Sequence, residues 1–463
     1  MRKSFMLAGA ISLAVSAAAC TSFLTDQRAS QDPNNPAVVT TLQLLTGVQA
    51  AQFIEQEGNP AFISCLWMQQ CQGLGGRFVS QESEYTITNG TTNSDFAAVY
   101  GGGGLLDIKT IESRSGTTGD LQFKGIAEVW EALVIGTAAD IWGDIPYREA
   151  SGDVAQPHYD PQLQVYDDIE AKLDQAITDL QGAGPGPGAN DFIYGGDVAK
   201  WTQAANTLKA RYHLHLVEVR GNSEYQKAVD AATSGIGSHA DDFLALHTSA
   251  TFERNVWFQF QVNSGFGDDL VAGATLVNIM NAQSDPRRAA YFGKTPNGNY
   301  GGADINEGVG PNGVSGLKGT RDNAAFSQPI VTSDENSLIL AEANFVLHGA
   351  AAAQPFLDQE RTSNGLTTIP ATMLSIMTEK YIALFQNVEV WSDYKRTCLP
   401  ARPAFVSPAF GHEIPGRFYY GSGEEATNSN TPSSAEQLQH GGDVTSGAGI
   451  SGFRNPNDPN PCT

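Results

Sequence analysis

The architecture of the chain is decided by residues 123 to 150, which read FKGIAEVWEALVIGTAADIWGDIPYREA. Apolar side chains recur there at helical spacing and share one face, which is formed by Ile126, Val129, Trp130, Leu133 and Ile141. A face of this kind packs inward. Gly143 tolerates the left-handed turn that ends helices, and the residue before Pro146 is pushed out of the α region. The stretch therefore predicts a long buried helix, a sharp stop and an extended exit with Tyr147, Arg148 and Glu149.

Further amphipathic helices are predicted on both sides of this stretch. The first covers residues 34 to 57. The second lies within residues 159 to 180, where Asp160 is the expected N-cap and Pro161 the first helical residue. A third begins after Asp197, which is its expected cap. Helix pairs that recur about every 30 to 40 residues favour a tetratricopeptide-like scaffold, in which each pair buries its face against the next.

Two more helices are predicted in the second half of the chain. Residues 332 to 349 read TSDENSLILAEANFVLHG, with Ser333 as the expected N-cap. Residues 373 to 397 are expected to form one continuous helix, whose apolar side consists of Met373, Met377, Tyr381, Leu384, Val388 and Trp391. The fold class is therefore mainly α, with a helical scaffold over about 34 to 247 and 333 to 398.

Two regions lack a helical pattern. Residues 248 to 332 are rich in glycine, asparagine and aspartate, with scattered aromatic residues. Loops on a rigid scaffold are frequent binding sites, so we predict a loop-rich insertion that carries the ligand site. The tail, about residues 421 to 463, offers no core pattern, and we expect it to wrap the surface or to fray.

The N-terminus has the pattern of an export signal over residues 1 to 19. Arg2 and Lys3 precede the apolar run FMLAGAISLAV, and the small residues SAAA precede Cys20. Lipoprotein signal peptidase acts before a cysteine in this setting, so we expect a lipid on Cys20 and a single mature domain over 20 to 463. The alternative is an ordinary signal peptide that leaves Cys20 as a free thiol.

The charge balance excludes one class of partner. The chain has 27 basic and 50 acidic residues. Removal of the two basic residues in the signal changes the net charge of −23 to 25 − 50 = −25. Nucleic-acid binding requires a basic surface, so we expect no nucleic-acid partner. No later apolar run approaches the roughly 18 residues of a membrane span.

Four cysteines follow Cys20, and an even number in an exported protein indicates disulfides. Cys65 and Cys71 could close a short loop, and Cys398 could hold the tail at Cys462. Three pairings remain open on the sequence alone. A metal site is disfavoured because no CxxC motif or histidine cluster accompanies these residues, and we predict no cofactor; a structural Ca²⁺ in the Asp/Asn-rich loops stays open.

No catalytic motif is present: GxSxG, HExxH, the Walker loop and GxGxxG are all absent. Glu342 and Glu379 lie in apolar helices, so at least one of them is expected to be buried and paired. A glycosidase would need two carboxyl groups roughly 5 to 10 Å apart across a cleft.

His213 and His215 are two residues apart and so face different sides of a helix, which favours positions at the edge of the core over metal binding.

The residues at the exit of the first helix have a structural interpretation. Trp142, Asp144, Tyr147 and Arg148 surround the turn at GDIPY. We expect their polar groups to cap or bridge neighbouring helices rather than to bind a ligand.

Six segments in chain order resemble the SusD/RagB family of outer-membrane nutrient-binding lipoproteins. They are Cys20 with TSFLTDQ, GDIPYREA, DFIYGGDVAKW with ANTLKARY, SDPRRAAYF, the LAEAN helix, and the block from EKYIALF to IPGRF. The set spans almost the whole mature chain. One departure occurs in the last block, where Gly421 stands in place of the family's proline. The resemblance implies a mostly α-helical, tetratricopeptide-like fold, a variable ligand region, and an outer-membrane position facing the cell exterior beside a SusC-like TonB-dependent transporter.

Aromatic residues are the candidates for ligand contact. Sugars stack their C–H faces on flat rings, and peptides use similar surfaces, so the sequence does not separate the two ligand classes. Our candidates are Trp67, Tyr85, Trp257, Phe260 and Tyr300. The alternative for each ring is that it packs a loop onto the scaffold.

We therefore expect a non-catalytic lipoprotein that binds oligosaccharide or oligopeptide nutrients and passes them to the transporter. Two alternatives remain. The first is a surface polysaccharide hydrolase, and the second is a structural lid of the transporter without its own ligand site.

Overall fold

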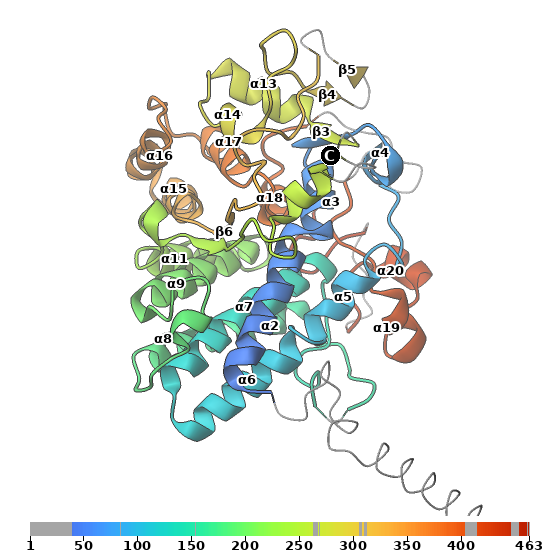
Figure 1. The fold of residues 1–463 in the computed structure, drawn as a ribbon, viewed down its shortest axis with the longest axis vertical. Helices are drawn as coiled ribbons and strands as arrows, with labels where there is room; N and C mark the ends of the chain where they lie inside the picture. Colours follow the sequence, from blue (N-terminus) through green and yellow to red (C-terminus); the bar gives the residue numbers. More distant parts are fainter. Residues whose placement is uncertain are drawn as a thin grey trace, which may run out of the picture.

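The computed structural model describes residues 39–83, 85–152, 154–262, 267, 269–304, 308–309, 313–402, 414–445, 453–460 and 462. The predicted signal, residues 1 to 19, and the predicted lipid site at Cys20 lie outside the described residues. Helices dominate the described part, and the few strands are short (Figure 1). The prediction of a mainly α fold is confirmed.

A series of helices forms the scaffold. Its members are α6 (Leu105–Thr118), α7 (Leu121–Trp142), α8 (Gln162–Leu180), α9 (Val198–His215), α11 (Asn222–Ala232), α15 (Ser333–His348), α16 (Ala350–Ser363) and α17 (Met373–Ala383). Consecutive members of the series from α6 to α16 pack on one another, and α17 packs on α15. In Figure 1 they stack from α6 and α8 at the bottom, through α9 and α11, to α15 and α16. This is the predicted tetratricopeptide-like succession of helix pairs.

Helix α7 confirms the predicted buried helix. The Asp120 carboxylate caps it by accepting from the Phe123 N–H at 3.1 Å. The helix ends at Gly143, whose φ is 88°. A Cβ at this position would lie 2.6 Å from Asn455 Oδ1 and 2.7 Å from the Gly442 carbonyl oxygen. Only glycine therefore satisfies both the turn and the close approach of the tail.

The remaining elements surround this scaffold. On the N-terminal side they are α2 (Thr41–Glu57), α3 (Asn59–Trp67), α4 (Gly76–Ser83) and α5 (Asn93–Tyr100). The central and C-terminal elements are α10 (Val217–Arg220), α12 (Val256–Val262), α13 (Ala274–Ala282), α14 (Arg288–Tyr291), α18 (Glu389–Thr397), α19 (Ser422–Thr427) and α20 (Ser434–His440). Two short 3₁₀ helices are Gly188–Asn190 and His239–Asp241.

Three antiparallel strand pairs occur in the described part. β1 (Cys71–Gly73) pairs with β3 (Leu270–Ala272), and Cys71 lies opposite Ala272. The other two pairs are β2 (Phe243–Ala245) with β6 (Gln328–Val331), and β4 (Ala303–Asp304) with β5 (Gly308–Val309). The pairs β1–β3 and β4–β5 lie beside α13 at one end of the molecule (Figure 1). The pairs β1–β3 and β2–β6 therefore join the predicted loop-rich insertion to residues outside it, whereas β4–β5 lies within it.

Several predicted boundaries need correction. Residues 373 to 397 form two helices, α17 and α18, because the chain turns at Gln386, whose φ is 67°. Thr332 rather than Ser333 caps α15, by accepting from the Glu335 N–H at 3.2 Å. The N-cap of α8 is Pro161.

The tail differs most from its prediction. It contains α19 and α20, and four polar residues after them are buried: Arg454, Asn455, Asn457 and Asp458. Asn455 donates to the carbonyl oxygen of Asp140 at 2.6 Å. The tail therefore enters the polar interior instead of fraying. The two disulfides, Cys65–Cys71 and Cys398–Cys462, are the pairs that the spacing favoured.

Candidate functional site

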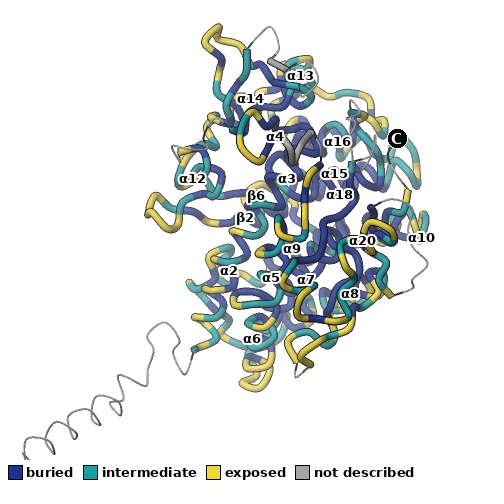
Figure 2. The backbone as a smooth tube through the Cα atoms, turned by 90° about the vertical axis from the view of Figure 1, so that its right-hand side faces the viewer, coloured by how far each residue is buried: buried dark blue, intermediate teal, exposed yellow. Residues whose placement is uncertain are grey.

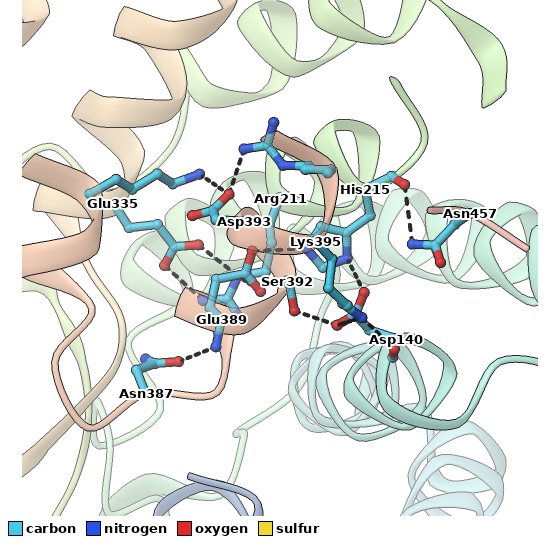
Figure 3. A network of polar contacts seen from close by, with 12 residues as sticks. Asp140, Arg211, His215, Glu335, Asn387, Glu389, Ser392, Asp393, Lys395 and Asn457 are labelled. Atoms are coloured by element: carbon cyan, nitrogen blue, oxygen red, sulfur yellow. Dashed lines mark hydrogen bonds and ion pairs between the residues drawn. The ribbon is translucent and has the colours of Figure 1, made fainter. Parts of the chain in front are cut away.

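A buried network of charges lies where α7, α9 and α18 meet the tail (Figure 3). Lys395 Nζ lies 3.1 Å from Asp140 Oδ2 and 3.3 Å from Asp458 Oδ2. His215 lies between Asp140, at 3.5 Å, and Glu389, at 2.8 Å. Burial opposes ionisation of Asp140, but the charges of Lys395 and His215 outweigh it and hold its pKa at about 2. Lys395 and His215 therefore each lie beside carboxylates.

This network has the composition of a catalytic centre but lacks the space for one. The cavity beside Asp140 and His215 has a volume of about 10 Å³, which is about the size of one water-sized probe. Arg211 extends the network to α15 through Glu335, with Nη2 to Oε2 at 2.7 Å. Because it ties α7, α9, α15, α18 and the tail together, we assign the network a structural role.

The two glutamates singled out in apolar helices are both buried and paired. Glu342 forms a bidentate ion pair with Arg396, in which Arg396 Nη2 lies 2.7 Å from Glu342 Oε2. Glu379 contacts Arg287 at 2.7 Å and also Arg361. The prediction of buried, paired carboxylates is confirmed.

The two histidines occupy different surroundings, as their spacing predicted. His213 lies 2.9 Å from Glu224 and 3.2 Å from Glu170, whereas His215 faces the central network. Both are buried. Within the described residues, no group of three or more His, Cys, Asp and Glu side chains is arranged to hold a metal ion.

The exit from α7 has the predicted bridging role. Asp144 accepts from the N–H groups of Gln162, Val444 and Thr445 at 2.8 to 2.9 Å, so it joins α8 to the tail. Tyr147 donates to Glu131 at 2.6 Å. These contacts hold the scaffold together, and Asp144 and Tyr147 are both buried.

Three of the five candidate rings are in the core, and their prediction as ligand contacts needs correction. Trp67 is 0% exposed, Tyr85 1% and Trp257 3%. Trp67 packs edge-on against Tyr85 and Trp391, and Trp257 packs edge-on against Phe62. A ring enclosed in this way has no face free for a sugar or a peptide.

Phe260 is half-buried on α12. Its ring lies 5.3 Å from that of Phe62 and 5.4 Å from that of Phe78, between centroids. These contacts attach α12 to the scaffold, which is the alternative that the sequence left open. A role of Phe260 in ligand binding stays a prediction.

Tyr300 is the candidate ring that lines an open pocket. The pocket has a volume of about 360 Å³, and its lining consists of Asn281, Arg288, Lys294, Gly298, Asn299 and Tyr300. Its lining residues come from α13, α14 and the loop after α14. Residues 296 to 299 of that loop are exposed, and Figure 2 shows exposed loop segments beside α13 and α14. This volume is at the lower end of the range for small-ligand sites.

A larger pocket was not singled out by the sequence. It lies between α5, the loop after GDIPY and α19, and has a volume of about 520 Å³. Phe96, Tyr100, Pro146 and Val154 are among its lining residues, with Glu424 as the charged one. The Tyr100 hydroxyl is buried without a hydrogen-bond partner among the described residues. No motif could reveal this pocket, because its walls come from three separate parts of the chain.

The fold and its pockets define a helical-repeat protein that presents concave surfaces on its loops, an arrangement typical of binding scaffolds. The chain belongs to the SusD-like family: residues 33–355 match the family model described as "starch-binding associating with outer membrane". The predicted SusD/RagB membership is thereby confirmed. No curated protein sequence matches the chain significantly.

Solved structures agree with this assignment. A chitin-binding protein is 22% identical with a TM-score of 0.74, over 91% of this chain and 100% of its own. A chitin-binding SusD homolog from Flavobacterium johnsoniae is 19% identical with a TM-score of 0.72, over 89% and 98%. A SusD-like protein from Bacteroides thetaiotaomicron is 21% identical with a TM-score of 0.71, over 88% and 97%. At these identities the likeness establishes the fold.

The family is associated with the outer membrane. Among the described helices, none combines the length and the apolar character that a membrane crossing requires.

Proposed function

We propose that this chain is a non-catalytic lipoprotein that captures a glycan outside the outer membrane and passes it to a SusC-like TonB-dependent transporter. The match of residues 33–355 to a starch-binding family carries this proposal. Two structural neighbours are described as chitin-binding, which favours a glycan over a peptide as the ligand. A lipid on Cys20 would hold the chain at the membrane.

The Tyr300 pocket is our candidate glycan site. It combines an aromatic ring with the amides of Asn281 and Asn299, which can bond to sugar hydroxyls. Its position in the predicted variable region agrees with a ligand site that differs between family members. Glu342 and Glu379, by contrast, are paired with arginines inside the scaffold, and this favours binding over hydrolysis.

The test is a thermal-shift and calorimetric titration of the mature chain with Cys20 removed. Starch, chitin and acidic oligosaccharides would be compared with oligopeptides. A ligand at about a hundred times its dissociation constant adds about 2.7 kcal/mol of stability. We expect a glycan to bind and to be recovered uncleaved; cleaved product would instead support the hydrolase.

Two variants locate the site. Tyr300→Ala should weaken glycan binding at least tenfold, because it removes the one aromatic ring of the pocket. Phe252→Ala is the control, since Phe252 is 97% exposed on a loop outside the pocket. Binding that is insensitive to Tyr300→Ala would move the site elsewhere, with the Tyr100 pocket as the next candidate. If no glycan binds, glycan capture is contradicted, and the alternative of a structural lid of the transporter is favoured.

A further inference from the structure

The lining of the Tyr300 pocket has an unusual charge for this chain. Among the described residues, it contains two cations, Arg288 and Lys294, and no carboxylate, although the chain has 50 acidic and only 27 basic residues. Neither cation forms an ion pair with a described residue. The pocket is therefore a local positive site on a negatively charged protein.

Arg287, the residue before Arg288, does have ion-pair partners, so the lack of such a partner is particular to Arg288. Arg287 contacts the carboxylates of Asp285, Glu360 and Glu379, each at 2.7 to 2.9 Å. Arg287 pairs with the Asp285 carboxylate, whereas Arg288 Nε donates to the Asp285 carbonyl oxygen at 2.8 Å. The two adjacent arginines thus have different functions: one holds the core, and the other faces the pocket.

The pocket is held in shape by hydrogen bonds. Asn281 at the end of α13 accepts from Arg288 Nη1 at 2.8 Å and donates to the Tyr300 carbonyl oxygen at 2.9 Å. The opposite wall is a turn in which Thr295 N–H donates to the Asn299 carbonyl at 2.8 Å. A single amide therefore fixes both the cation and the residue that bears the ring. Nη2 of Arg288 makes no hydrogen bond with a described residue and remains available.

The cations also lie close to the aromatic ring. Arg288 Cζ is 5.3 Å from the Tyr300 ring centroid, and Lys294 Nζ is 5.9 Å from it. Cations at this distance are attracted to the ring but keep free hydrogen-bond donors. A ligand that rests on Tyr300 would therefore meet two positive groups beside it.

We propose that the Tyr300 pocket selects a glycan unit with a negative charge, that is, a uronic acid or a sulfated sugar. This inference rests on the proposed function of glycan capture. The carboxylate or sulfate would accept charge-assisted hydrogen bonds from Arg288 Nη2 and Lys294 Nζ, while the ring of the sugar contacts Tyr300. A neutral glucan or chitin unit would leave both cations without a partner. The net negative charge of the chain disfavours non-specific adsorption of anions.

The experiment compares ligands that differ only in charge. Short oligogalacturonates and their methyl esters share one backbone, and sulfated and desulfated κ-carrageenan oligosaccharides form a second matched pair. Calorimetric titration of the mature chain with Cys20 removed should show at least tenfold tighter binding of the acidic member in one of the pairs. Equal affinity within both pairs, or no binding of either acidic probe, would overturn the inference.

Three variants assign the effect to the pocket. Arg288→Gln and Lys294→Gln should each weaken binding of the acidic probe about tenfold and leave any binding of its neutral counterpart unchanged. Lys294 is exposed and makes no hydrogen bond with a described residue, so its replacement should not affect folding. Arg254→Gln is the control, because the Arg254 side chain bonds, among the described residues, only to the Ser249 carbonyl oxygen.

The two proposals fail in different ways. If neutral starch or chitin fragments bind through Tyr300 and the charge variants have no effect, glycan capture stands and the selection of acidic sugars is wrong. If no glycan of any charge binds, the proposed function itself is wrong. If acidic probes bind but neither Gln variant weakens them, the acidic ligand lies outside this pocket and the inference is refuted.

Discussion

The carboxylate of Asp144 provides the sharpest test of how the GDIPY turn holds the fold. Its Oδ1 accepts from the Gln162 N–H at 2.8 Å, at the start of α8. Its Oδ2 accepts from the N–H groups of Val444 and Thr445, both at 2.9 Å, and from the Thr445 hydroxyl at 2.8 Å. Asp144 is 1% exposed. One side chain therefore joins the exit of α7, the first turn of α8 and the tail.

Asp144→Asn keeps the shape of this side chain but changes its acceptors. The amide oxygen can replace Oδ2, and the NH₂ group then faces the Gln162 N–H, so that two donors oppose each other. A buried N–H left without an acceptor costs about 1–3 kcal/mol, and hydrogen bonds to a charged acceptor are worth about 1.5–3 kcal/mol against about 1 for neutral ones. We expect a total loss of about 2–4 kcal/mol.

The assay is urea unfolding followed by tryptophan fluorescence, with amide hydrogen exchange as a local readout. The variant should unfold at lower urea, and the amides of Val444 and Thr445 should exchange faster. Asp168→Asn is the control, because Asp168 pairs with Arg148 on the surface, where ion pairs contribute little. If Asp144→Asn unfolds at the same urea concentration as the parent and keeps both amides protected, the bridging role of Asp144 is refuted.

Three further predictions concern charge and cross-linking elsewhere in the chain. Glu342→Gln should destabilise the chain, by up to about 3–5 kcal/mol, because buried Arg396 then keeps only Asp393 of its two carboxylate partners; adding Arg396→Met should recover part of this loss in urea unfolding, and strictly additive costs would contradict the pairing. Burial and a neighbouring carboxylate raise the pKa of Glu55 to about 8. Between pH of about 4.5 and 8 the folded chain therefore holds a proton that the unfolded chain has lost, so stability should fall as pH rises through this window, and Glu55→Gln should flatten that part of a thermal-unfolding profile. Replacing Cys398 and Cys462 by Ser should lower stability by about 4 kcal/mol, the chain entropy of closing a loop with a separation of 64 residues; an unchanged unfolding midpoint would contradict it.

Helical periodicity predicted the scaffold because long helices such as α7 bury one face continuously. The same signal failed between α17 and α18. Leu384, Val388 and Trp391 keep helical spacing across the break, so the pattern cannot reveal that the chain turns there. The available signal was Asn387, whose side chain accepts from the Glu389 N–H at 3.0 Å at the start of α18.

The ligand residues were harder to predict than the scaffold. Trp67 and Tyr85 stand among Gln, Ser and Thr, a composition typical of exposed segments, yet the pairing of β1 with β3 and the packing of α18 enclose that segment. For the tail the prediction was wrong in the opposite way, because residues expected at the surface are buried. Its polar residues lack an apolar pattern, but they match a polar interior, since Asp458 lies 3.3 Å from Lys395.

The segments that resemble the family mark the scaffold and leave the ligand open. GDIPYREA supplies the bridge at Asp144, the LAEAN helix supplies Glu342, and the KRT segment supplies Lys395 and Arg396 to buried pairs. Each acts by joining helices, so the same residues can serve members that bind different ligands.

The segment SDPRRAAYF is the exception that links scaffold to site. Its first arginine, Arg287, is fixed in the core by three carboxylates. This anchoring sets the direction of the short helix α14, and the next residue, Arg288, then lines the pocket beside Tyr300. Arg287→Met should accordingly disturb both the stability of the chain and the charge selectivity of the pocket, whereas Arg288→Gln should affect only the selectivity. Loss of stability with unchanged selectivity in Arg287→Met would show that α14 is held by other contacts.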